Sequence, residues 1–236
     1  MCTNCEIKNV PLILAVSKPS KSLSARLLSM WKNVCLPRVI RRVYGAPLKR
    51  ADLPGLFQAG YITRSGFKHS EEHALIYKGD ILNLDPNQEV LIRINSACFT
   101  GDIFHDASCD CNEQMEISFQ MLVANEGPGI VLYHFGHEGK AHGYVEKLEA
   151  YDGQMYPVKG DRRDFRSAIS ILRDLGITKV KVMTNNPEKV KILGEYGIQV
   201  TGIVPVVSKD PSLADFYDYK ARTFNHALPT KERHSA

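Results

Sequence analysis

Three short stretches rich in β-branched and aromatic residues follow one another in the first half of the chain. They span residues 58–63, 73–77 and 89–94, and turn residues separate them at Ser65-Gly66 and Asp85-Pro86. We expect these stretches to be strands of a small antiparallel sheet or barrel. The last of the three delivers the chain directly into Cys98.

From residue 112 onward, helical and strand patterns alternate. The spacing of apolar residues predicts helices at 113–124, 145–151, 165–175 and 189–196, and strands at 129–133, 180–184 and 199–207. Alternation of this kind is typical of a partly parallel sheet. The expected fold class is therefore α+β (mixed α/β): a small antiparallel, barrel-like N-terminal part, followed by a mixed sheet with packed helices.

The first fifty residues differ from the rest in charge. They hold ten Lys or Arg and one acid, Glu6, whereas the whole chain has a net charge of only +4. Apolar residues at helical spacing predict an amphipathic helix from about residue 23 to Pro37, followed by a short basic segment at 38–44. An organelle-targeting sequence, an anionic-surface binder, a partner-docking extension and a helical extension packed on the body all fit this pattern.

We therefore divide the chain into three parts. Residues 1–50 form a basic, partly helical extension, residues 51–222 a catalytic domain, and residues 223–236 a polar tail. No run of eighteen apolar residues exists, so no membrane span is expected. The six cysteines form no regular disulfide framework, which indicates a reducing compartment. We expect a cytoplasmic protein, and the basic N-terminal segment leaves organelle targeting open.

Three of the cysteines lie within fourteen residues. Cys98, Cys109 and Cys111 form a C-x10-C-x-C run, which suits a zinc site with three thiolates and one open position for water. Such a zinc is catalytic, because it lowers the pKa of its water to about 7. The alternatives are a closed structural zinc site, or two buried cysteines with a third nearby by chance.

Taken together, the motifs resemble the GTP cyclohydrolase II family, whose members open the guanine ring on the riboflavin pathway. The resemblance covers roughly residues 51–222. Its landmarks are the cysteine run with its flanks (93–102 and 109–111), Leu132-Tyr-His134, Glu138-Gly139, Ala150-Tyr151, Arg163-Asp-Phe165 and Thr184-Asn-Asn-Pro187.

The resemblance implies a catalytic role for six residues. Cys98, Cys109 and Cys111 would hold one zinc ion, which promotes attack on the purine and release of formate. Arg163 would be the nucleophile toward the α-phosphorus or, alternatively, would only stabilise phosphate charge. Asp161 would accept a proton or form a structural ion pair with Arg163. Tyr151 would donate a hydrogen bond near the ring or the leaving group, or would be a helix-end aromatic.

The resemblance also implies a nucleotide-binding set and partners. The substrate-binding positions would be Arg93, Gln114, Glu138, Gly139, Lys140, Thr184 and Lys189. Mg2+ would bridge the triphosphate of GTP, and family members are commonly homodimers. The mildly acidic body and the absence of a nucleic-acid motif make RNA and DNA unexpected partners.

The sequence departs from the family pattern near the expected zinc. Asn95 and Ala97 stand where the family usually has histidine and glutamate, and Lys140 stands in place of an arginine. The segment between Tyr151 and Asp161 is shorter than usual. His137 and His142 are additions that could act as acid or base, or simply lie at the surface.

Three hypotheses follow from these departures. The first is a GTP cyclohydrolase II-type enzyme that releases formate and pyrophosphate. The second is a diverged enzyme that acts on another nucleotide or stops at a formylated intermediate. The third is a catalytically silent paralogue that contains zinc and binds a nucleotide or a protein partner.

Overall fold

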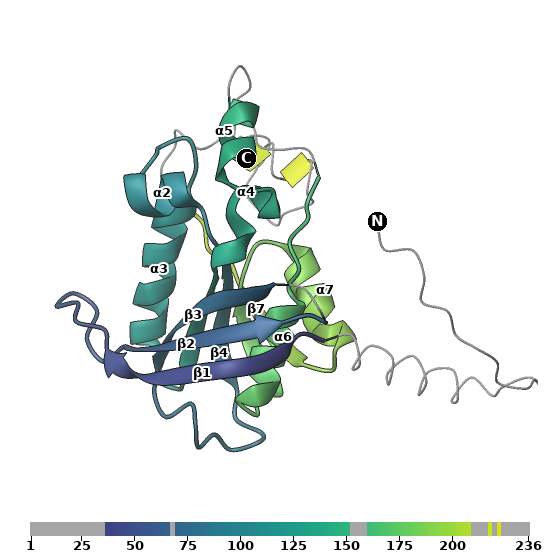
Figure 1. Cartoon of the computed structure of the whole chain (residues 1–236). Coiled ribbons are helices and arrows are strands. Elements are labelled where there is room, and N and C mark those ends of the chain that lie inside the picture. Colours follow the sequence, from purple (N-terminus) through teal and green to yellow (C-terminus); the bar gives the residue numbers. More distant parts are fainter. Residues whose placement is uncertain (1–35, 67–68, 152–159, 209–216, 219–220, 223–236) are drawn as a thin grey trace, which may run out of the picture. The chain divides into compact units, whose positions relative to one another are not determined.

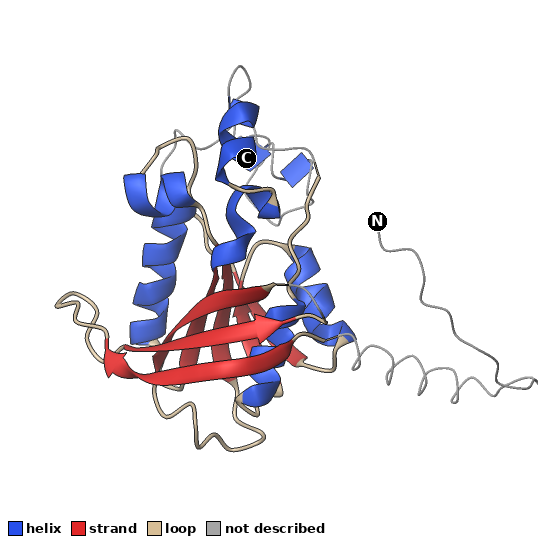
Figure 2. Ribbon diagram, viewed as in Figure 1, coloured by secondary structure: helices blue, strands red, loops and turns tan. Residues whose placement is uncertain are grey.

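The computed structural model describes residues 36–66, 69–151, 160–208, 217–218 and 221–222 (Figures 1 and 2). Most of the helix predicted from about residue 23 to Pro37, and the polar tail predicted at 223–236, lie outside these residues. The side chain of Tyr151 also lies outside them.

A mixed sheet of seven strands forms the centre of the described part, in the order β1-β2-β3-β5-β4-β6-β7. The strands are β1 (Arg38–Pro47), β2 (Phe57–Arg64), β3 (Ser70–Lys78), β4 (Val90–Ser96), β5 (Gly129–His134), β6 (Lys179–Met183) and β7 (Gln199–Val204). The pairs from β1 through β3 to β5 are antiparallel, whereas β5, β4, β6 and β7 run parallel. One sheet thus joins the antiparallel and parallel parts.

Helices cover both faces of this sheet (Figures 1 and 2). They are α2 (Phe99–Phe104), α3 (Cys111–Ala124), α4 (Glu138–Ala141), α5 (Tyr144–Tyr151), α6 (Arg166–Asp174) and α7 (Pro187–Glu195), with a 3-10 turn at Phe135–His137 before α4. α3 lies on one side of the sheet, and α6 and α7 lie on the other (Figure 1). Within the described ranges, no helix is long and apolar enough to cross a membrane.

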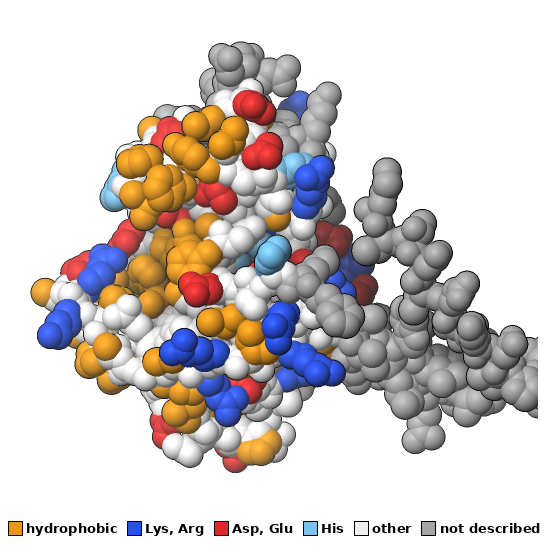
Figure 3. Space-filling model, in the orientation of Figure 1, with side chains coloured by type: hydrophobic (Ala, Val, Ile, Leu, Met, Phe, Trp, Pro, Cys, Tyr) orange, Lys and Arg blue, Asp and Glu red, His pale blue; other side chains and the backbone are white. Residues whose placement is uncertain are grey.

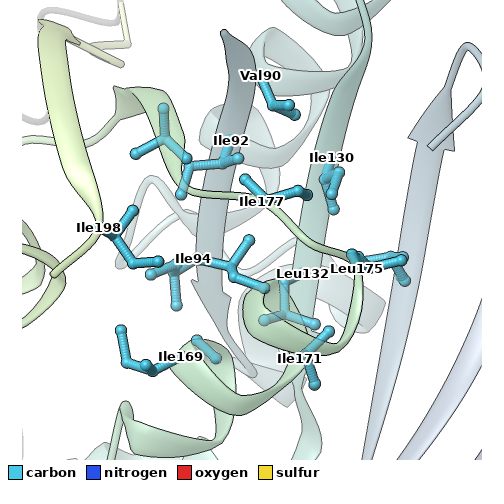
Figure 4. Packing of buried hydrophobic residues seen from close by; sticks show 14 of the residues in the cluster. Val90, Ile92, Ile94, Ile130, Leu132, Ile169, Ile171, Leu175, Ile177 and Ile198 are labelled. Carbon is cyan, nitrogen blue, oxygen red and sulfur yellow. The ribbon is translucent and has the colours of Figure 1, made fainter. Parts of the chain in front are cut away.

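Strand β4 is buried on both faces and divides the core in two. Val90, Ile92 and Ile94 point to the α6 side, where they pack with the apolar residues of β5 and α6 (Figure 4). Leu91 belongs to the second cluster, together with Met115 and Leu122 of α3 and Val131 of β5. This alternation follows from the two-residue period of a strand.

The predicted mixed α/β fold class is confirmed, and each strand and helix predicted between residues 58 and 207 has a counterpart in the structure, apart from differences of a few residues at the ends. The strand predicted at 89–94 was grouped with the antiparallel set. The structure instead pairs it in parallel with β5 and β6. The reason is that apolar side chains occupy both faces of this strand, at Val90, Leu91, Ile92 and Ile94, which suits a parallel strand with both faces covered.

Four elements were not predicted: α2, β1, the 3-10 turn at Phe135–His137 and α4. α2 begins directly after Cys98 although it contains Thr100 and Gly101, two residues with low helix propensity. β1 arises from the basic segment that we assigned to the N-terminal extension, and it pairs with β2 at the edge of the sheet. The sheet therefore begins before residue 51, the predicted start of the catalytic domain.

Gly129 of β5 lies where the helix α3 packs closely on the sheet. A Cβ atom at this position would lie 2.4 Å from Leu122 Cδ1 and 3.1 Å from the carbonyl oxygen of Leu91. Leu122 is fully buried and cannot move aside. We expect Gly129→Ala to lower the free energy of unfolding by about 1–3 kcal/mol, measured by urea denaturation.

Gly60→Ala is the matched control, because Gly60 also lies in a strand and has nothing within 4 Å of the place that an added methyl group would take. It should leave stability unchanged or raise it by up to about 1 kcal/mol. Equal losses in the two variants would contradict the packing argument.

Candidate active site

The predicted site residues gather where the parallel strands end. Cys98 follows β4, Glu138 follows β5 and Thr184 follows β6. Because these three strands are neighbours and run in the same direction, their carboxyl ends lie at one edge of the sheet. Ligands of open α/β sheets bind at this edge.

The three cysteines of the C-x10-C-x-C run come together. Their sulfur atoms all lie within 4.8 Å of one another, and the Cys98 and Cys109 sulfurs are 3.7 Å apart. Two sulfurs bound tetrahedrally at about 2.3 Å from one zinc ion lie about 3.8 Å apart. The spacing of the sulfur atoms therefore fits zinc.

Gly101 leaves the space in which these sulfurs meet. A Cβ atom at this position would lie 2.8 Å from Cys109 Sγ and 3.2 Å from Cys98 Sγ. No side chain larger than hydrogen fits there without displacing a sulfur. The first turn of α2 thus provides a cradle for the three-sulfur group, which could hold a metal ion.

The thiols affect one another strongly. Hydrogen bonds from Cys109 and Cys111 lower the pKa of Cys98, and the nearby Lys147 ammonium lowers it further. Hydrogen bonds with Cys109 and Cys98 raise the pKa of Cys111, as does burial. Three thiolates at this spacing repel one another, so their joint ionisation requires a cation between them.

Lys147 of α5 reaches the same group, although its side chain is only 4% exposed. Its Nζ lies 3.1 Å from Cys98 Sγ, 2.8 Å from Thr100 Oγ1 and 2.9 Å from Glu138 Oε1. Burial alone would lower its pKa, but Glu138 and Cys98 outweigh burial and raise it. Lys147 is therefore a charged ammonium at neutral pH.

Arg163 and Asp161 form a bidentate pair beside the end of β4. Asp161 accepts hydrogen bonds from Arg163 Nε (2.9 Å) and Nη2 (2.5 Å). Burial raises the pKa of Asp161, but the hydrogen bonds and charge of Arg163 lower it below its ordinary value. Asp161 is thus ionised at neutral pH, as a proton acceptor must be.

Arg163 also contacts the residue that leads into the cysteine group. Its Nη1 donates to Ser96 Oγ (3.3 Å), and Ser96 lies two positions before Cys98. The hydroxyl of Ser96 in turn meets His137 Nδ1 at 3.2 Å, while His137 Nε2 lies 3.3 Å from the carbonyl oxygen of Asp164. Because a carbonyl only accepts, His137 carries its proton on Nε2 and accepts from Ser96.

His137 is 5% exposed, so the surface position considered for it in the sequence is wrong. Burial, followed by the charges of Arg163 and Lys189, lowers its pKa to about 3. Its ring stacks on His134 at 4.5 Å, and His134 meets His73 edge to face at 4.7 Å. These three imidazoles form a buried, neutral cluster behind Arg163.

Phe165 explains part of the Arg163-Asp-Phe165 motif. The Arg163 guanidinium and the Lys189 ammonium each lie 5.4 Å from the centre of its ring. Lys189 Nζ also donates to the carbonyl oxygen of Ile94 in β4 (2.7 Å). The aromatic ring therefore orients two predicted phosphate partners through cation–π contacts.

Arg93 and Gln114 are in contact on the other face of β4. Arg93 Nη2 donates to Gln114 Oε1 (2.9 Å), and Arg93 Nε donates to Asn95 Oδ1 (3.0 Å). Gln114 Nε2 donates to Asp110, between two of the cysteines, at 2.5 Å. Burial lowers the pKa of Arg93 to about 10, so it remains charged at neutral pH.

The loop after β5 is held at both ends. Glu138 accepts hydrogen bonds from the amides of Phe99 and Gly139 in addition to its contact with Lys147. Gly139, Lys140 and Ala141 all have positive φ, between 55° and 64°, which is costly for the two non-glycine residues. The carbonyl oxygen of Lys140 accepts from the Arg162 amide (3.1 Å), which ties this loop to the Asp161–Arg163 segment.

Two predicted residues have a more indirect place. Thr184 is buried, and its hydroxyl accepts from the Asn186 amide at the start of α7. Tyr151 is the last residue of α5, one turn after Lys147 along the chain. The functional roles of both stay predictions.

An apolar rim lies beside the cysteine group. Figure 3 shows hydrophobic side chains gathered over α2 and α5, where the exposed residues include Phe99, Ile103, Phe104, Val145 and Leu148. Phe99 contacts Phe104 and Tyr144 edge to face, with ring centres 5.1 and 5.4 Å apart. These contacts hold α2 against α5, and an apolar surround limits the access of solvent to a metal site.

The sequence interpretation did not identify Lys147 or Gly101. Lys147 could have been found from the helix predicted at 145–151, because it lies four residues before Tyr151 and thus shares its face. Gly101 lies one helical turn after Cys98, but α2 itself was not predicted.

The comparison with known proteins agrees with this geometry. The family model described as GTP cyclohydrolase II matches residues 54–205, well over half of the chain. The chain belongs to the GTP cyclohydrolase II family. The resemblance inferred from the cysteine run and the motifs downstream is thereby confirmed.

Relatives of this GTP cyclohydrolase II family member occur in plants and bacteria. The chain is 39% identical over 165 residues to the monofunctional riboflavin biosynthesis protein RIBA 3, chloroplastic, of Arabidopsis thaliana, covering 65% of this chain and 31% of the relative. It is 40% identical over 147 residues to the riboflavin biosynthesis protein RibBA of Rhodococcus erythropolis, covering 57% of this chain and 34% of the relative. The chain thus matches about a third of the length of these relatives.

The residues that depart from the GTP cyclohydrolase II pattern form hydrogen bonds with their neighbours. Asn95 accepts a hydrogen bond from Arg93 and donates to the carbonyl oxygen of Ser96. The amide of Ala97 donates to the carbonyl oxygen of His134, which extends the pairing of β4 with β5. Most of the shortened segment after Tyr151 lies outside the described residues.

Gly101→Ala tests the sulfur cradle. The added methyl group would overlap Cys109 Sγ, so we expect zinc affinity to fall by at least about tenfold, measured by competition with a colorimetric chelator. Gly194→Ala is the control, since Gly194 is also helical and has nothing within 4 Å of a methyl position. Normal zinc binding by Gly101→Ala would contradict the proposed position of the metal.

His137→Gln tests the buried imidazole by its pH dependence. The folded pKa of about 3 lies below the unfolded value, so the unfolded state binds more protons and stability falls as pH decreases below about 6.5. Between pH 7 and pH 5, His137 should account for about 2 kcal/mol of this loss. The variant should therefore lose about that much less stability than the wild type over this interval, measured by urea denaturation.

The exposed His69 provides the control for this experiment. His69→Gln should follow the wild-type pH dependence. Parallel curves for wild type and His137→Gln would show that His137 titrates normally and would contradict its burial.

Proposed function

We propose that this protein opens the imidazole ring of GTP by zinc-dependent hydrolysis. The products would be formate, pyrophosphate and a diaminopyrimidine ribonucleotide. The names of the relatives, which refer to riboflavin biosynthesis, agree with this reaction.

The hydrogen bond between Arg163 and Ser96 is the observation that carries the proposal. A nucleotide has its base and its phosphates at opposite ends, so the reaction needs a hydrolytic centre and a phosphate-handling cation at one edge of the protein. Ser96 joins the two, because it contacts Arg163 and lies two residues before Cys98.

Cys98, Cys109 and Cys111 would hold the zinc ion. When bound there, zinc supplies Lewis-acid chemistry, which activates water for attack at neutral pH. Glu138 and Gln114 offer hydrogen-bonding groups for the polar edge of a purine, and Lys140 and Lys189 offer positive charge for the phosphates.

For Arg163, we propose charge stabilisation at the phosphates rather than nucleophilic attack. Its guanidinium donates three side-chain hydrogen bonds to Asp161 and one to Ser96, and a protonated guanidinium has no free electron pair. Asp161 would hold the guanidinium fork in place and accept a proton. Tyr151 would donate a hydrogen bond near the ring or the leaving group.

Further features of the proposal come from the family resemblance. Mg2+ would bridge the triphosphate, and the active form would be a homodimer. We propose a cytoplasmic location; the basic first fifty residues and the chloroplastic plant relative support an organelle as the alternative.

The proposal is tested by incubating zinc-loaded protein with GTP and Mg2+ and following formate and pyrophosphate by mass spectrometry. We expect both products in equal amounts. Cys109→Ser should abolish them by removing a metal ligand, and Arg163→Ala should lower the rate by about 10²–10³-fold by removing charge stabilisation.

Arg166→Ala is the matched control for Arg163→Ala. Arg166 forms the same kind of pair with the aspartate two residues earlier, Asp164, at 2.6 Å. Its replacement by Ala should leave the rate of product formation within a few-fold of the wild-type rate. Pyrophosphate without formate would favour the diverged enzyme. Folded, zinc-loaded protein that leaves GTP unchanged would contradict the proposal.

A further inference from the structure

Lys147 joins the cysteine group to the loop after β5. A buried ammonium is costly unless its donors are satisfied, and this one has three acceptors for its three N–H groups: Cys98 Sγ, Thr100 Oγ1 and Glu138 Oε1. Cys98 and Thr100 belong to the segment that contains the first cysteine of the sulfur group, and Glu138 belongs to the loop after β5. The same cation therefore contacts both parts of the site.

The surrounding fold brings Lys147 to this position. A Cβ atom at Gly139 would lie 3.2 Å from the Cβ of Lys147, so the glycine permits the close approach of α5 to the loop. On the other side, Phe99 packs against Tyr144 at the start of α5. The position of Lys147 is thus fixed by two contacts of α5, one with the loop at Gly139 and one with Phe99 of α2.

Charge explains why a cation is needed there. Three thiolates, a zinc dication and the Glu138 carboxylate sum to a charge of −2, and the Lys147 ammonium, which contacts one sulfur and the carboxylate, halves this excess. A hydrogen bond to a thiolate also stabilises its charged form and orients it toward the metal. A side chain such as Met, with neither a charge nor a hydrogen-bond donor, supplies neither effect, and a neutral donor supplies only the hydrogen bond.

We propose that Lys147 is a positioning residue that holds the Cys98 thiolate for the metal and, through Glu138, fixes the loop that follows β5. Loss of the ammonium should weaken zinc binding and loosen the loop together. This inference rests on the proposed function only for the meaning of the loop as a nucleotide-binding element.

The test replaces Lys147 with Met, which has similar length but no charge. Zinc affinity, measured by chelator competition, should fall by about 10–100-fold. In the Co2+-loaded protein, the thiolate-to-metal charge-transfer band should move to longer wavelength, because a sulfur without its hydrogen bond gives up charge more easily. Hydrogen exchange of the peptide containing Glu138 and Gly139 should become faster.

Lys191→Met is the control, because Lys191 is an exposed helix lysine paired with Glu188. It should change none of the three measurements. Lys147→Arg, which keeps the charge, should restore most of the zinc affinity. If Lys147→Met does not fold, Lys147→Gln is judged by the same three measurements.

Zinc affinity within threefold of the wild type and an unmoved cobalt band would overturn the inference. A general loss of structure would not imitate the predicted result, because the charge-transfer band reports on the sulfur–metal bonds themselves. No measurement uses GTP, so the inference can hold for a protein that leaves GTP unchanged, and it can fail for one that hydrolyses GTP.

Discussion

The burial of β4 on both faces is the constraint on which the site depends. With neighbours on both edges and helices on both faces, this strand cannot shift its register by one residue without moving Arg93 away from Gln114 and into the apolar cluster on the α6 side. Its polar residues are therefore assigned to fixed sides. Arg93 faces Gln114 on one side, Ser96 faces Arg163 on the other, and the strand ends where Cys98 begins the sulfur group.

Positively charged side chains lie on both sides of the site. Lys189 and Arg163 are held on one side by the ring of Phe165, and Lys189 also reaches a carbonyl oxygen of β4. Arg93 and Lys147 are oriented by Gln114 and Glu138 respectively. Each cation is thus oriented by a protein partner before any ligand binds, which lowers the cost of ordering it on binding.

The sequence predicted what depends on short separations along the chain. The three cysteines lie within fourteen residues of one another, and their spacing indicated a shared site; Asp161 and Arg163, two residues apart, were assigned from the family resemblance. The contact of Lys147 with Cys98 spans 49 residues, and that of Lys189 with the Ile94 carbonyl spans 95. Such contacts depend on the insertion of β4 between β5 and β6, which periodicity does not reveal. The burial of His137 has the same origin, and β1 was missed because its basic residues resemble those of the preceding segment.

The difference between local and distant contacts also bears on how the site tolerates change. A three-thiolate site needs every ligand. A side chain at position 101 would overlap the sulfurs, so this part of the site allows little substitution. Hydrogen-bonding positions can change when a neighbour supplies a replacement, as Asn95 does by accepting from Arg93. The amide of Ala97 pairs with β5 whatever its side chain, so the missing carboxylate leaves the backbone of the metal site intact. Departures from the family pattern are therefore expected at hydrogen-bonding side chains rather than at the three cysteines and Gly101.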